Sequence, residues 1–139
     1  MKFNRLNLDQ EFLYKRAFVE AEKIFEKPST RKGRELDEIV QTCLYGHAAE
    51  VYLMSLGYVD DTRPYKDLFE PDNTSVEIKV TEHIGNVPYV LNRCRDKILD
   101  KNNWSGHPLR VYVWINDKKS DEYTLNGIYD WNGRGWIKK

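Results

Sequence analysis

The chain has 139 residues, with 22 Lys and Arg against 22 Asp and Glu. This length suits a single domain with one hydrophobic core, spanning residues 1–139. The balanced charge excludes a protein that binds nucleic acid through its overall charge, so any such binding needs a local basic patch. No stretch approaches the ~18 apolar residues of a membrane span. We therefore expect a soluble, cytoplasmic protein that does not contact a membrane.

Two helices are predicted in the first half of the chain. Residues 7–27 carry an apolar stripe at helical spacing that includes Leu13 and Ala17, with Asn7 as the N-cap. The stripe packs either within the chain, as core, or against a partner, and we favour packing within the chain. Residues 35–56 form the second helix. Gly46, inside that helix, costs ~1 kcal/mol relative to alanine, which indicates close approach by another backbone.

The loop between these helices holds a small basic cluster, made of Arg31, Lys32 and Arg34. Such a cluster is either a solvated loop or a contact for phosphate.

Residues 65–80 predict a strand, a tight turn and a second strand, because residues 71–74 (Pro-Asp-Asn-Thr) are typical of turns. On the second strand Val76, Ile78 and Val80 point to the core, and three polar side chains point the other way. These are Glu77, Lys79 and Thr81. This polar face is either solvated strand surface or a functional site.

A carboxylate of the first strand can join this polar face under one condition. Asp67 shares the face of Glu77 only if the hairpin has an odd loop, or a bulge, between Phe69 and Val76.

A third helix is predicted over residues 87–101, with Pro88 in its first turn. Its outer side is the best basic surface of the chain and carries Arg93, Arg95, Lys97 and Lys101. Strands over residues 109–115 and 122–131 follow, the second with a kink at Gly127. Residues 132–133 (Asn-Gly) predict a hairpin turn before a short edge strand.

Asp67, followed by Glu77-x-Lys79 on the next strand and preceded by Glu50 on a helix, resembles the PD-(D/E)xK nuclease superfamily. The resemblance covers residues 40–115. The literal Pro-Asp pair, residues 71–72, lies in the turn, so Asp67 is the preferred aspartate. The resemblance implies an α/β (α+β) fold with a restriction-endonuclease-like mixed sheet flanked by helices, here with an N-terminal helical portion.

The resemblance further implies a metal-dependent endonuclease that uses Mg²⁺, or Mn²⁺, to hydrolyse phosphodiester bonds. The expected metal ligands are Asp67, Glu77, the carbonyl of Ile78, and Glu50 directly or through water. Lys79 would orient the attacking water or neutralise developing charge. DNA is the expected substrate, with RNA less favoured.

The basic helix, Thr81 and the basic loop would contact the DNA. Double-strand cleavage would suggest a homodimer, with the stripe of the first helix as its interface. The alternative is a non-catalytic module that binds nucleic acid or protein.

Overall fold

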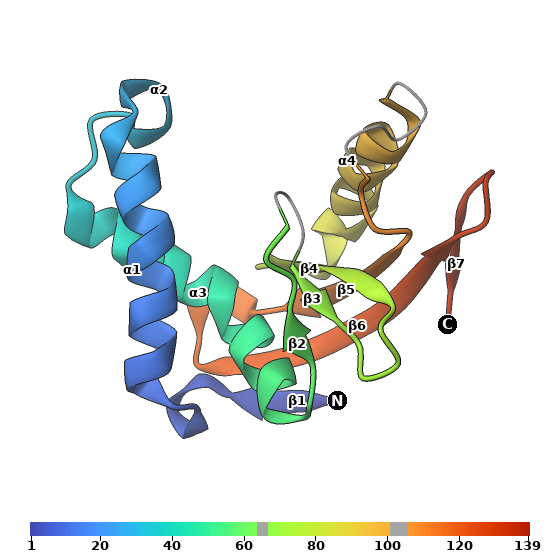
Figure 1. Cartoon of the computed structure of the whole chain (residues 1–139), viewed down its shortest axis with the longest axis horizontal. Coiled ribbons are helices and arrows are strands. Elements are labelled where there is room, and N and C mark those ends of the chain that lie inside the picture. The colour runs from blue at the N-terminus through green and yellow to red at the C-terminus, as the bar shows by residue number, and fades with distance from the viewer. Residues whose placement is uncertain (64–66, 101–105) are drawn as a thin grey trace.

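The computed structural model describes residues 1–63, 67–100 and 106–139 (Figure 1). Lys101 lies outside these residues. The helices and strands are β1 (Lys2–Asn4), η1 (Arg5–Asn7), α1 (Gln10–Glu26), α2 (Pro28–Arg31), α3 (Leu36–Ser55), β2 (Val59–Asp60), β3 (Leu68–Phe69), β4 (Ser75–Thr81), η2 (Ile84–Asn86), α4 (Val87–Leu99), β5 (Arg110–Ile115), η4 (Asp117–Lys119), β6 (Glu122–Trp131) and β7 (Trp136–Lys138).

The strands form one seven-stranded sheet with the order β1-β6-β5-β4-β3-β2, and β7 pairs with β6. β4 and β5 are parallel and α4 connects them, whereas the other strand pairs are antiparallel. The predicted mixed sheet with flanking helices is therefore confirmed. The extra residue in β6 lies next to Gly127, where the register with β5 shifts, as the expected kink required.

Both faces of the central sheet are buried, and a different helix covers each face. Residues of α3 pack with Ile78 and Trp114 on one face. Leu91 and Cys94 of α4 pack with Val113 on the other. Because β5 is covered on both sides, its sequence is almost continuously apolar.

The apolar stripe of α1 packs against α3 within the chain. Ala17 and Ala21 are fully buried in a cluster with Ile39 and Val40. The favoured prediction, that the stripe packs within the chain, is thus confirmed, whereas the homodimer stays a prediction. The small side chains of Ala17 and Ala21 let α1 and α3 approach closely, and α3 covers this part of the stripe.

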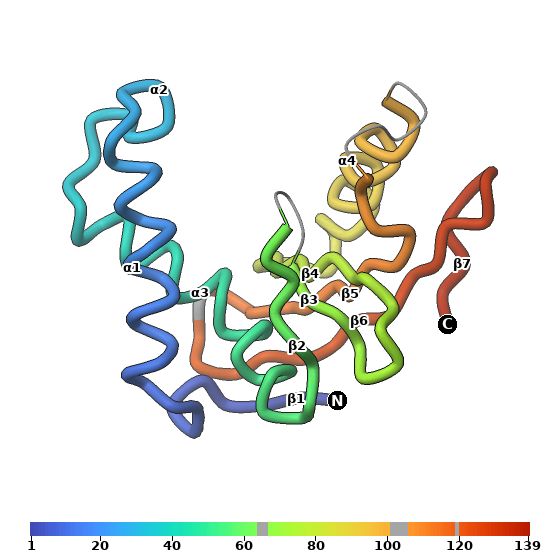
Figure 2. Tube along the Cα trace, viewed as in Figure 1, coloured from blue at the N-terminus to red at the C-terminus, as the bar shows by residue number. Residues whose placement is uncertain are grey.

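The amino terminus differs from the prediction. Residues 2–4 form β1 and pair with β6, because Phe3 stacks on Tyr123 in the core. Figure 2 shows this first segment running beside β6. The helix then begins at Gln10, and its N-cap is Asp9, whose carboxylate accepts from the amide of Phe12.

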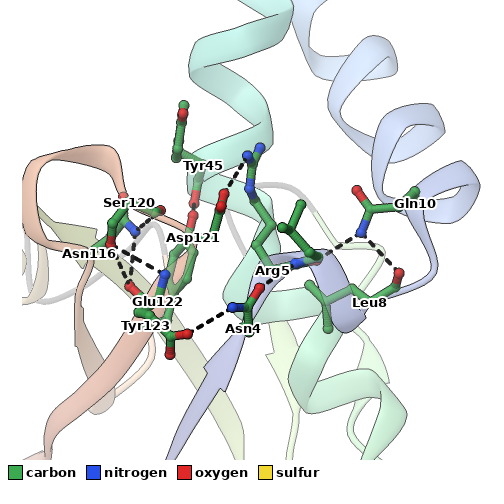
Figure 3. Close-up of polar contacts among 11 residues, drawn as sticks. Asn4, Arg5, Leu8, Gln10, Tyr45, Asn116, Ser120, Asp121, Glu122 and Tyr123 are labelled. Carbon is green, nitrogen blue, oxygen red and sulfur yellow. Dashed lines mark hydrogen bonds and ion pairs between the residues drawn. The ribbon is translucent and has the colours of Figure 1, made fainter.

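Asn7 does not cap α1, because the chain makes a 3₁₀ turn there. Figure 3 shows Gln10 donating its side-chain amide to the carbonyls of Arg5 and Leu8.

Figure 1 also shows how the helices frame the sheet. α1 and α2 stand at one end of the molecule, β2 and β3 lie in the middle, and α4 and β7 lie toward the other end. This arrangement leaves the β3–β4 hairpin in the middle of the molecule.

The expectation for Gly46 is wrong. A Cβ built at Gly46 would meet no atom within 4 Å. The close approach to the sheet is made instead by Ala48 and Ala49, which are fully buried.

Gly46→Ala should therefore stabilise the protein by about 1 kcal/mol, because alanine has the higher helix propensity and nothing obstructs its methyl group. Gly57→Ala is the matched control. Gly57 ends α3 with φ +100, so alanine there should destabilise by about 1–2 kcal/mol. Urea unfolding measures both. A Gly46→Ala variant less stable than wild type would contradict the open environment.

Candidate functional site

The hairpin between β3 and β4 decides where Asp67 lies. Leu68 pairs with Val76 and Phe69 with Ser75, so residues 70–74 form a loop of five residues. The loop is closed by hydrogen bonds between Glu70 and Thr74 and between Asn73 and Glu70, each 2.8 Å long. The predicted odd loop is confirmed, and the register places Asp67 opposite Glu77.

The polar face of β4 is not solvated at Glu77, which is only 7% exposed. Its Oε1 lies 3.3 Å from Lys79 Nζ, and its Oε2 lies 3.4 Å from His107 Nε2. α4 packs across this face and brings the buried thiol of Cys94 near it. A buried carboxylate with two cationic or polar neighbours indicates a functional or structural site and not a solvated strand surface.

Asp67 lies within hydrogen-bonding reach of both the sheet and Glu77. Its Oδ2 accepts the amide of Ile78 at 2.8 Å, a bond that favours the ionised form. Burial, together with the negative charges of Glu77 and Glu50, outweighs that bond and raises the pKa of Asp67 to about 8. At neutral pH and without metal, Asp67 therefore keeps a proton beside the Glu77 carboxylate.

These properties fit a divalent cation. Asp67 is half-buried and Glu77 is buried, and the two carboxylates can ionise together only against their mutual repulsion. They supply hard oxygen donors, and a cation would replace the retained proton. Ile78 contributes its amide to Asp67, and its side chain packs in the core.

α3 places Glu50 near this pair through a buried polar network. Glu50 is buried, with 6% of its surface exposed. Its Oε1 accepts from Arg16 at 3.2 Å, and Arg16 also binds Asp60 of β2 at 2.9 Å. Glu50 Oε2 lies 2.9 Å from His47 Nδ1.

His47, which is half-buried, belongs to the same network. Its other ring nitrogen contacts Glu20. Burial alone would favour the neutral imidazole, but Glu20 and Glu50 on either side raise the pKa of His47 to about 9. His47 is therefore a cation at neutral pH and offsets the charge of Glu50.

Within residues 1–63, 67–100 and 106–139, no three acidic, histidine or cysteine side chains lie close enough together to hold a metal ion. The structure brings Asp67, Glu77 and Lys79 together directly. It places Glu50 within electrostatic reach of Asp67, with both of its carboxylate oxygens in contact with cations.

The predicted nucleic-acid contacts on the second half of the chain lie on exposed and half-buried surface. Arg93 and Lys97 are exposed on α4, whereas Arg95 pairs with Asp96 at 3.1 Å. The hydroxyl of Thr81 accepts from Asn86 at 3.2 Å. Lys101, predicted for the same surface, lies outside the described residues.

The basic loop is partly a short helix, α2. The Arg31 guanidinium lies 3.8 Å from the centre of the Phe25 ring. Arg34 donates to the carbonyls of Arg31 and Thr30, so both arginines stabilise the turn itself. Lys32 is exposed beside them, with φ +52.

Sequence reasoning missed two residues of the site, His107 and Arg16. His107 Nδ1 lies 2.8 Å from the carbonyl of Pro108 and donates to it, which turns Nε2 toward Glu77. Burial lowers the pKa of His107, against the opposing effect of Glu77. Neither residue has a spacing signal, because their partners are distant in the sequence.

A comparison of the chain with protein-family models, characterised proteins and solved structures found no match. Of the helices that the structure describes, none has the length and apolar character needed to cross a bilayer.

Asp67→Asn should stabilise the metal-free protein at alkaline pH. The unfolded chain loses the Asp67 proton near pH 4, but the folded chain retains it to about pH 8, so the free energy of unfolding falls between these values. Asparagine can still accept the Ile78 amide and does not ionise. We expect a gain of at least about 1 kcal/mol at pH 8.5 and a smaller difference at pH 5.

Thermal and urea unfolding in EDTA at the two pH values measure this difference. Glu22→Gln, an exposed carboxylate of α1, is the control and should show no comparable pH dependence. A stability difference between Asp67→Asn and wild type that does not change with pH would rule out the raised pKa.

Proposed function

We propose that this chain is a metal-dependent nuclease that hydrolyses phosphodiester bonds, with DNA as its substrate. The observation that carries the proposal is a pair of adjacent carboxylates, half-buried Asp67 opposite buried Glu77, with Lys79 Nζ 3.3 Å from Glu77. Juxtaposed buried carboxylates repel each other and cost stability, and such groups are concentrated at functional sites.

The order of elements supports the same proposal. α3 is followed by the antiparallel strands β2, β3 and β4, then by α4 and the parallel strand β5. This order agrees with the restriction-endonuclease-like core that the PD-(D/E)xK resemblance implies. Asp67 immediately precedes the short strand β3, and Glu77 lies on β4, which joins the hairpin to the rest of the sheet.

Asp67, Glu77 and the carbonyl of Ile78 would hold Mg²⁺ or Mn²⁺, and Glu50 would act directly or through water. When bound, such a cation polarises a phosphate and acidifies a coordinated water. Because Arg16 and His47 hold both oxygens of Glu50 in the metal-free structure, its role through water is favoured.

Lys79 would act as a cation and not as a base. Burial by itself would lower its pKa, but the neighbouring groups, with Glu77 foremost among them, together outweigh burial and raise the pKa of Lys79 above its ordinary value. The ammonium group would donate to the attacking water or to a phosphate oxygen and stabilise the charge that develops in the transition state.

DNA would contact α4, where Arg93 and Lys97 are exposed. Contacts of this kind grip phosphate without reading the sequence. The choice of DNA over RNA rests on the resemblance.

A non-catalytic module that binds nucleic acid or protein is the second candidate. It is favoured by the contacts of Glu50, whose two carboxylate oxygens already pair with Arg16 and His47. In that case the Glu77–Lys79 and Glu50–Arg16 pairs would serve only the fold.

Cleavage of plasmid and branched DNA with Mg²⁺ or Mn²⁺ tests the proposal. Asp67→Asn and Glu77→Gln should each reduce the rate by about 100-fold or more, because each removes a metal ligand. Asp72→Asn is the matched control, since Asp72 lies in the exposed turn, and it should cleave at the wild-type rate.

Two results would contradict the nuclease. One is a folded wild-type protein that cleaves neither DNA in either metal. The other is loss of cleavage in Asp72→Asn but not in Asp67→Asn, which would move the site into the turn.

Metal binding should also release a proton. Because Asp67 holds its proton up to about pH 8, Mg²⁺ affinity should rise by as much as about tenfold per pH unit below that value and level off above it. Calorimetry in two buffers of different ionisation enthalpy measures both quantities. An affinity that is constant from pH 6.5 to 8.5 would exclude Asp67 as a ligand.

A further inference from the structure

A groove of about 840 Å³ runs along one flank of α1, and lysines line it. Lys15, Lys23 and Lys27 all contribute to it and are all exposed. Residues four or eight apart share a helix face, so Lys15 and Lys23 project on the same side of α1. At ~1.5 Å per residue they are ~12 Å apart, which matches the rise over about three to four phosphates of one DNA strand.

The lysines of this groove have little internal compensation. Lys15 pairs with Glu11 at 3.0 Å, an exposed contact between successive turns that contributes little. In the described part of the chain, Lys23 and Lys27 form no ion pair. Glu20 also lines the groove, and its carboxylate is already in contact with His47. The groove therefore presents an excess of positive charge, although the chain as a whole is neutral.

The floor of the groove is continuous with the candidate site. Arg16 and His47 both line the groove, and both contact Glu50. Arg16 also binds Asp60 of β2, so this flank of α1 faces the β2 edge of the sheet. In Figure 1, α1 stands on one side of β2 and β3, and α4 stands on the other.

We propose that the lysine-lined groove of α1 binds the phosphate backbone of the DNA substrate and leads it to the site at Asp67 and Glu77. The proposal rests on the proposed nuclease function and names the path of its substrate. DNA would be held on two sides of the reacting centre, by the groove on α1 and by the exposed cations of α4.

The apolar part of the groove fits the same occupant. Phe12 is 40% exposed and Val19 is 54% exposed, and both line the groove among the lysines. Apolar side chains between cations suit a strand whose charged phosphates alternate with sugars and bases. An apolar protein partner would instead have to bury several lysines without carboxylates to pair them, which is costly.

The test is DNA binding without cleavage. Fluorescence anisotropy in EDTA, with labelled duplex and branched oligonucleotides, compares wild type with the double variant Lys23→Glu/Lys27→Glu. We expect Kd to rise by about tenfold or more and the slope of log K against log salt to fall by about 2. Lys23→Gln/Lys27→Gln should give a smaller change in the same direction, without placing negative charge at the end of α1.

The matched control is Lys2→Glu/Lys118→Glu. It makes the same change in net charge at exposed lysines outside the groove, and it should change Kd by less than about threefold. Circular dichroism and thermal unfolding confirm that each variant is folded.

Cleavage measured in parallel with Mg²⁺ separates the two proposals. In the groove variant, KM should rise while kcat at saturating DNA is retained. If groove and control variants bind DNA equally, the groove proposal is overturned, and cleavage by wild type still supports the nuclease. If wild type never cleaves DNA but its DNA binding depends on Lys23 and Lys27, the nuclease proposal is overturned and the DNA-binding groove is supported.

A poly-glutamate peptide tests the protein alternative in the same assay. If the groove variant loses this peptide but still binds DNA as wild type does, the groove is a site for an acidic protein and the DNA path is overturned.

Discussion

The proximity of two carboxylates, half-buried Asp67 and buried Glu77, is the constraint on which the rest of the site depends. Each would be solvated and ionised in the unfolded chain, so bringing them together opposes folding as the pH rises. Their neighbours reduce that cost. Lys79 and His107 contact Glu77, and the amide of Ile78 is donated to Asp67. A pair of carboxylates that costs stability, and whose charge is only partly offset by its neighbours, is typical of a functional site.

The second group of charges links α1 to the sheet. Arg16 reaches from α1 to Glu50 on α3 and Asp60 on β2, so one guanidinium joins three elements. With His47 it lets Glu50 be buried as a carboxylate. Breaking such a pair from one side leaves an uncompensated buried charge, which is more costly than removing both partners. The same two cations also line the groove along α1, so the groove and the site share these two side chains.

Much of the secondary structure was predictable, because it depends on neighbours in the chain. The alternation of β4, the limits of α3 and α4, and the turn before β7 follow from periodicity and turn residues. The errors at β1, at the cap of α1 and at Gly46 share one cause. Phe3 packs on aromatic rings far along the chain, and the contact surface of α3 is made by Ala48 and Ala49.

For the site, the sequence by itself determined which residue types were available and which of them share the polar face of β4, since side chains alternate along any strand. It left open whether Asp67 joins them, because that depends on whether the loop is odd or even. The folded structure decided that the loop is odd, and it buries Glu77 beneath α4. It also brings His107 to Glu77 and Arg16 to Glu50. These contacts join segments distant in the sequence, so their geometry exists only once the sheet and helices have packed.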